Sequence, residues 1–254
     1  MKIQVLGGHG GEAKGYGTTS YLIDNKILID AGSVAGALDT KDQVNIDHIF
    51  ISHPHLDHIK DLAFLCDNCF GLRSAPFEVH THPTVKKAIL DHLLNDVIWP
   101  DFTKLPNKEK AILRIHEMHP EEAVTVMGYT VRGIPVNHPH DAMGFIVTKG
   151  ETSVLFTLDS GTTDRIWEVA KKTPNLRGIF TEVSFPDSMQ KVADLSQHHT
   201  SATMKDELLK MPQGVKVILT HFKPNYRDEI LEEIEAIGDK RICVLQNDGE
   251  VFNF

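Results

Sequence analysis

The segment HPHLDH (residues 53–58) places three histidines and one aspartate within six residues, directly after the apolar run HIFIS. Imidazole and carboxylate groups are the usual ligands of transition-metal cations in proteins. His53 and His55 are two residues apart, so on an extended segment both side chains face the same way and can bind one cation. Asp57 and His58 come after the turn and can reach a second cation. The segment therefore predicts a metal-binding site.

Three further ligand-type residues also follow apolar runs. His138 follows TVRGIPV, Asp159 follows SVLFTL and His221 follows VKVILT. Loops after strands often carry functional side chains, because the strand holds the loop in place. In this arrangement His138 adds a third imidazole to the first cation, Asp159 bridges the two cations, and His221 binds the second.

A two-metal site of this kind predicts hydrolytic chemistry. Two cations roughly 3.5–4 Å apart lower the pKa of a shared water and hold the attacking and leaving oxygens. Mixed histidine and carboxylate ligation favours zinc, and manganese and iron stay open. The sequence thus predicts two divalent transition-metal ions as cofactors.

The composition limits the partners and the location. The chain has 254 residues, a formal net charge of −9, 15 histidines and three cysteines. The acidic balance counts against nucleic acid as a partner, because phosphate contacts need clustered Lys and Arg. Three cysteines are too few for a disulfide framework and fit a reducing compartment. The N-terminal apolar run is too short for a secretory signal and no stretch approaches the ~20 apolar residues of a membrane span, so we expect a cytoplasmic protein without a membrane partner.

Short apolar segments with turn signals between them recur along the whole chain. They predict strands at KIQVL, TSYLID, KILID, HIFIS, FEVH, AILRI, TVRGIPV, GFIVT, TSVLFTL, RGIF, VKVILT and RICVL. Helical periodicity appears at residues 83–95, 163–172, 201–210 and 227–237. Two strand-rich halves, each with its own helices, indicate two sheets packed face to face with helices outside. No linker divides the halves, so we expect a single domain over residues 1–254.

The pattern H-x-H-x-D-H with later His, Asp and His resembles the metallo-β-lactamase superfamily. This resemblance implies an α/β fold, a four-layer αββα sandwich with a dinuclear metal site at one edge. It also implies the ligand set His53, His55, Asp57, His58, His138, Asp159 and His221. His138 is preferred to His140 because a His six residues before a Gly-aromatic pair is typical of the superfamily's phosphodiesterase branch, and Gly144-Phe145 stands in that relation to His138.

Other segments resemble, in order, the class II cyclic-nucleotide phosphodiesterases of this superfamily. They are LNDVIWPDFT (94–103), VNHPHDAMGF (136–145), LDSGTTDRIWEVA (158–170), TEVSFPDS (181–188) and LSQHHT (195–200). The resemblance implies hydrolysis of a 3′,5′-cyclic nucleotide of the cAMP or cGMP type to the 5′-monophosphate by a hydroxide that bridges the metals. Gln197-His198-His199-Thr200 departs from the Gly-His-Leu-Thr of the family, and Thr181 and Val183 flank Glu182. These departures leave the substrate preference open.

The same resemblance implies the remaining catalytic roles. His198 matches the general acid of an H-x-T element, and Glu182 matches the carboxylate that orients it; Asp57 counts as both ligand and catalytic residue. The alternative for His198 and for His199 is a surface position ahead of an amphipathic helix, and for His199 that alternative is favoured.

Substrate contacts are expected from three residues outside the ligand set. His140 is a candidate for contact with the substrate, and Trp99 and Phe102 could stack on a nucleobase. The Gly-rich run GGHGGEAKGYGTTS (7–20) lacks the spacing of a phosphate-binding loop, so we expect a loop that borders the site. The partner is therefore a small cyclic nucleotide, and the sequence leaves a homodimer open.

Three alternative functions remain at this point. The first is an RNA-processing phosphodiesterase like tRNase Z, against which the acidic charge and the lack of a basic substrate arm count. The second is hydrolysis of a cyclic dinucleotide. The third is a non-hydrolytic diiron protein that binds oxygen, but such relatives typically carry Glu where this chain has His55.

Overall fold

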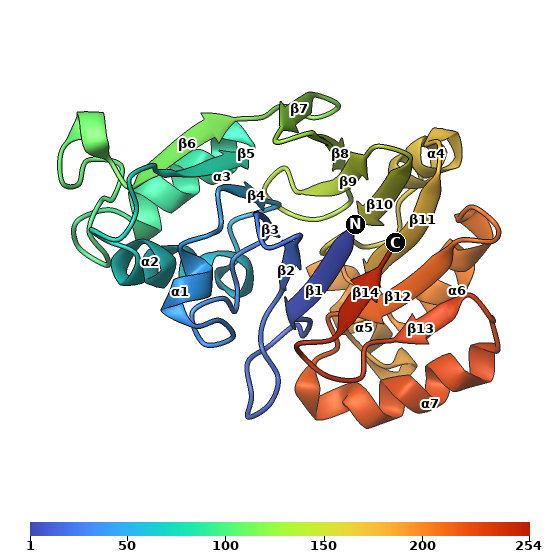
Figure 1. Ribbon diagram of the computed structural model, residues 1–254. Coiled ribbons are helices and arrows are strands. Elements are labelled where there is room, and N and C mark those ends of the chain that lie inside the picture. Colours follow the sequence, from blue (N-terminus) through green and yellow to red (C-terminus); the bar gives the residue numbers. More distant parts are fainter.

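A computed structural model describes residues 1–254 as two seven-stranded sheets packed face to face (Figure 1). The first sheet has the strand order β14 (Val251–Asn253), β1 (Lys2–Gly7), β2 (Ser20–Ile23), β3 (Ile27–Ile29), β4 (His48–Ile51), β5 (Phe77–Thr81) and β6 (Leu113–Glu117). The second sheet has the order β13 (Ile242–Val244), β12 (Lys216–Thr220), β11 (Leu176–Glu182), β10 (Thr152–Phe156), β9 (Met143–Lys149), β8 (Tyr129–Pro135) and β7 (Ala123–Val126).

Seven α-helices accompany the sheets. They are α1 (Thr40–Gln43), α2 (Leu56–Asn68), α3 (Pro83–Ala88), α4 (Arg165–Lys172), α5 (Gln190–Ser196), α6 (Ser201–Lys210) and α7 (Arg227–Ile237). Short turns of other helix types are η1 (Ile89–Leu93, a π-helix), η2 (Lys108–Lys110), η3 (Asp187–Met189) and η4 (Pro224–Tyr226). In Figure 1 the helices α1 to α3 accompany the first sheet, and α4, α6 and α7 accompany the second.

Three apolar clusters lie between these layers. One joins the first sheet to α2 and α3 through residues such as Ile49 and Leu62. The middle cluster lies between the sheets and includes Phe50 and Phe145, whose ring centroids are 5.9 Å apart. The third joins the second sheet to α4, α6 and α7 and includes Trp167. The expected four-layer αββα sandwich is therefore confirmed.

Each sheet changes from antiparallel to parallel pairing partway across. In the first sheet β3, β4, β5 and β6 are parallel, and in the second β10, β11, β12 and β13 are parallel. The carboxyl ends of parallel strands meet at one edge of a sheet, which is where ligand sites of open α/β sheets usually lie. This topology brings loops from both halves of the chain to one place.

The structure adds elements that the sequence analysis did not predict. The largest is α2, which begins at Leu56, so that Asp57 and His58 lie in its first turn rather than in a loop. His55 precedes the helix without a side-chain cap, so the usual N-cap signal is missing. The helix expected at 83–95 is α3 continued by the π-helix η1. The short strands β7 and β14 and the helices α1 and α5 were also not predicted.

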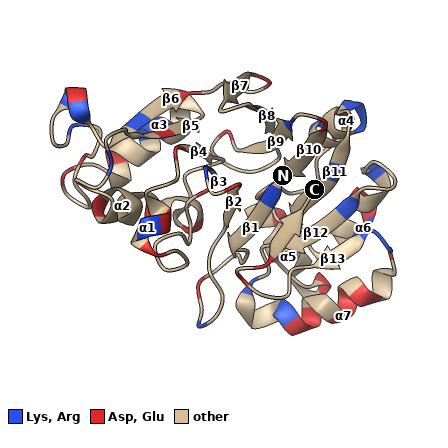
Figure 2. Cartoon of the chain, in the orientation of Figure 1, with Lys and Arg blue, Asp and Glu red and all other residues tan.

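None of the helices combines the length and the apolar character needed to cross a bilayer. Cys66, Cys69 and Cys243 are all free thiols, the first two buried in the core around α2. Figure 2 shows that acidic side chains gather on α7, whereas Lys and Arg are scattered over several elements in this view.

Candidate metal centre

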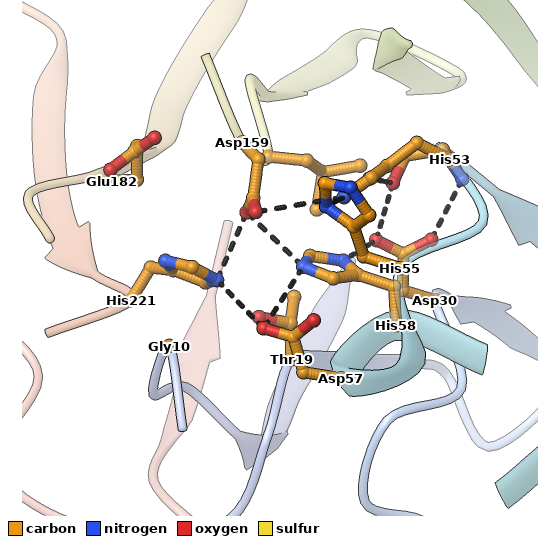
Figure 3. Close-up of polar contacts among 12 residues, drawn as sticks. Gly10, Thr19, Asp30, His53, His55, Asp57, His58, Asp159, Glu182 and His221 are labelled. Atoms are coloured by element: carbon orange, nitrogen blue, oxygen red, sulfur yellow. Dashed lines mark hydrogen bonds and ion pairs between the residues drawn. The ribbon is translucent and has the colours of Figure 1, made fainter. Parts of the chain in front are cut away.

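The seven candidate ligands converge from both halves of the chain on one edge of the sandwich. They come from the segment after β4 (His53, His55), the first turn of α2 (Asp57, His58), and the loops after β8 (His138), β10 (Asp159) and β12 (His221). They form two groups of four that share Asp159, within which the ligand atoms all lie within 4.8 Å of one another. Figure 3 shows several of these side chains pointing toward Asp159.

The first group consists of His53, His55, His138 and Asp159. Nδ1 of His55 lies 3.0 Å from Nε2 of His53 and 3.3 Å from Nε2 of His138. Oδ2 of Asp159 lies 3.6 Å from the His53 nitrogen and 3.9 Å from the His138 nitrogen. Three imidazoles and one carboxylate oxygen therefore surround one point.

The second group consists of Asp57, His58, His221 and the same Asp159. Oδ1 of Asp159 lies 3.2 Å from Nε2 of His58 and 3.0 Å from Nε2 of His221. Oδ2 of Asp57 lies 3.8 Å and 3.6 Å from the same two nitrogens. Asp159 thus offers one oxygen to each group, which is the placement required of a bridging carboxylate.

The hydrogen bonds at the backs of four imidazoles fix which nitrogen faces the centre. Nδ1 of His58 donates to Asp30 at 2.6 Å, and Nδ1 of His138 donates to the carbonyl oxygen of Gln197 at 3.1 Å. Nδ1 of His53 donates to the Ser52 hydroxyl at 2.9 Å, and Nδ1 of His221 donates to the Ser184 hydroxyl at 3.0 Å. Each hydroxyl accepts from its histidine because it donates its own proton to a carboxylate. In each neutral ring the lone pair therefore lies on Nε2, the nitrogen that faces the centre.

Unpartnered buried atoms show that these residues fit a bound cation. Nε2 of His58, Nε2 of His221 and Oδ1 of Asp159 are buried and accept no hydrogen bond. Leaving one such atom unpaired costs roughly 1–3 kcal/mol, and here three of them face one another. A divalent cation satisfies all three at once, so the donor set fits a metal.

The pKa shifts of two imidazoles in the first group and of the shared carboxylate also fit metal ligands. Burial lowers the pKa of His138 to about 4, and burial together with His58 lowers the pKa of His53 well below its usual range. Both rings are therefore neutral, the form that binds metals. Burial opposes ionisation of Asp159, but His221 and His58 outweigh it and hold the pKa of this carboxyl well below its usual range.

A buried carboxylate behind the first layer of ligands orients two of them. Asp30 is fully buried at the end of β3 and accepts hydrogen bonds from the Ser52 backbone N–H at 2.8 Å and from the Ser52 hydroxyl at 2.8 Å. It also accepts from His58 directly, and through Ser52 it reaches His53. One carboxylate thus holds an imidazole of each group. Such outer contacts fix the ring orientation and raise the basicity of metal ligands.

His198 and Glu182 form a hydrogen-bonded pair beside the ligand groups. Oε1 of Glu182 accepts from Nδ1 of His198 at 2.6 Å, and the His198 ring lies 5.0 Å from the His138 ring and 5.5 Å from the His221 ring. Burial lowers the pKa of His198, but Glu182 outweighs this effect and the net shift is upward. Burial raises the pKa of Glu182, but His198 lowers it more, to about 2. An ionised carboxylate thus favours the protonated ring.

Ser184 joins this pair to the metal ligands. Its hydroxyl donates to Oε2 of Glu182 at 2.6 Å and accepts from Nδ1 of His221 at 3.0 Å. The hydroxyl is also 3.2 Å from Nδ1 of His198. One fully buried serine therefore contacts the carboxylate, the candidate acid and a candidate ligand.

The loops that carry His138 and Asp159 are bonded to each other. The Gly161 backbone N–H donates to the Asn137 carbonyl oxygen at 2.8 Å, and the Asn137 side chain donates to the Thr162 carbonyl oxygen at 3.0 Å. Gln197, which ends α5, has φ 55° in the left-handed region. The Gly that the resemblance to the phosphodiesterases implies at this position would fit this backbone better than Gln, since Gly adopts positive φ without strain.

The Gly-rich run borders the site, as expected. A Cβ on Gly10 would lie 2.7 Å from the His221 ring, so only glycine allows the loop to pack this closely on that ring. Oδ1 of Asp248 accepts from the Gly8 backbone N–H at 3.1 Å, and Oδ2 accepts from the Gly17 backbone N–H at 2.5 Å.

The two expected base-stacking residues differ in their exposure. Phe102 is only 3% exposed and packs in the core beside Phe70, with no ring face open to a base. Its proposed stacking role is therefore corrected: the aromatic ring completes the core around α2. Trp99 packs edge-on against Phe64. Phe64 lies on α2, seven residues and thus roughly 10 Å along the helix from Asp57. His140 is exposed, and its ring lies 5.5 Å from the His55 ring, at the rim of the site.

Three contributors to the site were missed by the sequence analysis. Asp30 ends the segment KILID, where an acidic residue also fits an ordinary turn. Ser52 and Ser184 lie within quoted motifs, next to His53 and two residues after Glu182, but a serine alone carries no metal-ligand signal. Only their hydrogen bonds identify them.

The sandwich with its histidine and aspartate clusters defines a metallo-hydrolase fold, and comparison with known proteins gives the family. Residues 25–222 match the family described as "Beta-lactamase superfamily domain", and the chain belongs to this family. The resemblance to the metallo-β-lactamase superfamily and its class II phosphodiesterases is confirmed.

Two curated relatives carry a phosphodiesterase name. The chain is 24% identical to a "Probable 3',5'-cyclic-nucleotide phosphodiesterase" of Yersinia pestis, covering 99% of this chain and 89% of the relative. It is 26% identical to "3',5'-cyclic-nucleotide phosphodiesterase 1" of Saccharomyces cerevisiae, covering 77% of this chain and 63% of the relative. A "Ribonuclease Z" of Bacteroides fragilis is 24% identical, covering 89% of both.

Solved structures show the same fold. Unliganded yeast PDE1 superimposes with a TM-score of 0.80 at 20% identity, covering 97% of this chain and 98% of that one. The metallo-beta-lactamase fold protein YhfI from Bacillus subtilis gives a TM-score of 0.78 at 21% identity, covering 99% of both chains.

Proposed function

We propose that this chain is a metal-dependent phosphodiesterase that hydrolyses a 3′,5′-cyclic nucleotide to the 5′-nucleoside monophosphate. The observation that carries the proposal is the His198–Glu182 pair beside two candidate ligand groups that share Asp159. The names of the relatives from Yersinia pestis and yeast support the same substrate class.

The chain's own residues would hold two divalent cations. His53, His55 and His138 would bind one, Asp57, His58 and His221 the other, and Asp159 both. Bound there, the cations polarise the phosphoryl oxygens and lower the pKa of water. Zinc is the proposed metal, because neutral imidazoles and carboxylates together suit it best.

His198 supplies the proton that the reaction needs. A water molecule that has released one proton to the solvent adds through its oxygen to phosphorus, the bond from phosphorus to the 3′ oxygen breaks, and that oxygen takes a proton from His198. His198 then regains a proton from the solvent. Nδ1 of His198 is bonded to Glu182, so Nε2 is the donating nitrogen. Ser184 and the buried Glu182 keep the ring in one orientation and favour its protonated form.

The whole chain, residues 1–254, is proposed as one hydrolase domain acting on a small molecule in the cytoplasm. The three free thiols fit that compartment. His140, at the rim beside His55, is the proposed contact to the substrate.

A turnover screen of the purified, metal-analysed protein tests this proposal. Its substrates are cyclic mononucleotides, cyclic dinucleotides, a precursor tRNA and an aryl phosphodiester. We expect conversion of cAMP or cGMP to the 5′-monophosphate, abolished in Asp159→Ala. Cleavage of the precursor tRNA or of a cyclic dinucleotide without turnover of cyclic mononucleotides would replace the proposed substrate by that alternative. Oxygen binding with no hydrolysis would favour the diiron reading.

A further inference from the structure

The ammonium of Lys223 lies at the rim of the candidate site. Lys223 follows His221 by two residues, in the loop between β12 and η4. Its Nζ donates to the carbonyl oxygen of Gly10 and lies 5.9 Å from the centroid of the Phe185 ring. That ring is in turn 5.9 Å from the ring of His198. The ammonium therefore contacts the Gly-rich loop and lies near an aromatic ring that neighbours the proposed acid.

The Gly10 carbonyl that accepts from this ammonium and the backbone of Lys223 are both held in place. Gly10 packs on the His221 ring at a distance that excludes any side chain, so its carbonyl oxygen has little freedom. The Lys223 backbone N–H donates to the carbonyl oxygen of Ser184 at 3.3 Å, which holds the other end of the residue against the site. The charge is therefore positioned from two sides.

The charge of Lys223 is not neutralised by the protein. Its contacts are a carbonyl oxygen and an aromatic face, and it forms no ion pair. Lys60, by contrast, is 3.3 Å from both Glu12 and Asp61. The half-buried Lys223 therefore has no carboxylate partner within the chain. Such a group can form charge-assisted hydrogen bonds with an incoming anion.

We propose that Lys223 binds a non-bridging oxygen of the substrate phosphodiester and of the phosphate monoester product. The substrate class rests on the proposed function, whereas the binding of a phosphate anion does not. The rival explanation is purely structural: Lys223 would serve only to hold the Gly-rich loop through its hydrogen bond to Gly10.

Three substitutions separate the effect of the Lys223 charge from the effect of its hydrogen bond to Gly10. Lys223→Gln keeps a hydrogen-bond donor for Gly10 and removes the charge, Lys223→Arg keeps the charge, and Lys223→Met removes both. The measurement is the Kd of inorganic phosphate by titration calorimetry on the metal-loaded protein, together with kcat and KM for cAMP. Metal content and unfolding midpoint are measured for each variant, so that loss of the cations or of the fold is recognised.

We expect Lys223→Gln and Lys223→Met to weaken phosphate binding by roughly 10–100-fold, the range of a hydrogen bond to a charged group. Lys223→Arg should stay within about tenfold of the wild type. For cAMP the loss should appear mainly in KM, because the ground state already carries the anion. The matched control is Lys216→Gln. The Lys216 ammonium also lies over an aromatic ring, 5.0 Å from the centroid of Phe252, and Lys216 begins β12 at the end away from the site. The control should bind phosphate as the wild type does.

If Lys223→Gln binds phosphate as strongly as the wild type, the proposal is overturned, because the charge would then play no part and the hydrogen bond to Gly10 alone would explain the contact. This holds whatever the result for Lys223→Met. If Lys223→Met does not fold, the Gln variant still decides. The proposed function can fail separately: a wild type that hydrolyses no cyclic nucleotide refutes that function, while the order of phosphate affinities still tests Lys223.

Discussion

Oγ of Ser184 and Nδ1 of His221 lie 3.0 Å apart, and this contact joins the candidate acid to the candidate metal ligands. The hydroxyl donates to Glu182 and accepts from His221, so it fixes the tautomer of one ring and one oxygen of the carboxylate. Glu182 in turn bonds His198. The orientation of the acid and the position of the ligand are therefore not independent.

Ser184→Ala tests this coupling. Loss of the hydroxyl leaves Nδ1 of His221 without its acceptor, and such outer contacts are typically worth 10–100-fold in metal affinity or activity. We expect the second cation to bind roughly 10–100-fold more weakly in a competition titration with a chelator. Ser188→Ala, on the exposed 3-10 turn η3, is the control and should titrate as the wild type does. Unchanged metal affinity in Ser184→Ala would show that the contact does not orient His221.

Asp159→Ala tests the bridging carboxylate. Because its two oxygens face the two ligand groups separately, its removal should cost at least one of two bound ions. Elemental analysis of protein purified with zinc and without chelator measures the loss. Asp206→Ala, at an exposed position on α6, should retain both ions. Finding a single ion in the wild type would contradict the two-metal site.

His198→Ala separates proton delivery from metal binding. The variant should keep its metal content and lose roughly 10²–10⁴-fold in turnover of a cyclic nucleotide, the usual contribution of a positioned acid. A nitrophenolate leaves without a proton, so the variant should lose far less on a nitrophenyl phosphodiester. Glu182→Gln should follow the same trend less severely. His92→Ala, at an exposed position, is the control. Equal losses on both substrates would assign the acid elsewhere, with His140 as the next candidate.

Gln197→Gly should stabilise the protein. Gln197 has φ 55° and hydrogen-bonds only through its backbone, including the carbonyl oxygen that accepts from His138. Removing the strain of a left-handed non-glycine residue raises the free energy of unfolding by roughly 1–2 kcal/mol. The greater flexibility of glycine in the unfolded chain lowers it again by about 0.5–1 kcal/mol. Urea unfolding should show a higher midpoint with an unchanged slope. A lower midpoint would mean that the side chain contributes packing that outweighs the strain.

His80 should make the stability of the protein depend on pH. Burial, with His48 and His116 nearby, lowers the pKa of His80 to about 4. Since the unfolded value is about 6.5, the unfolded chain binds the proton more readily between pH 6.5 and 4, and stability falls as the pH falls through this window. His80→Phe keeps the stacking on Phe50 and cannot be protonated. Its free energy of unfolding should therefore fall less between pH 7 and 5; an equal fall would remove His80 as the cause.

The sequence was informative wherever function requires particular residue types at strand ends. The convergence of His138, Asp159 and His221 could be predicted because each follows an apolar strand, and strands that run in the same direction bring such residues to one edge. Asp30 could not, because its role depends on contacts with residues more than 20 positions away, His58 and Ser52.

The elements that were missed share a different cause. In α2 the metal-ligand motif occupies the first turn and replaces the usual cap, and in β7 the partly exposed, alternating pattern gives no strong apolar signal. Phe102 misled because an aromatic residue next to an exposed turn looks available, whereas the fold closes the core over it.

The division of the ligand groups between the two sheets has an energetic consequence. Residues 53–58 belong to the first sheet, and His138, Asp159 and His221 belong to the second, so each group needs both halves in register. Cation binding and sheet-to-sheet docking are then thermodynamically linked: an ion that binds only the assembled halves adds RT ln(1 + [ion]/Kd), about 2.7 kcal/mol at 100 times Kd. A chelator should therefore act as a mild denaturant of this protein, and cation concentration should set its melting temperature.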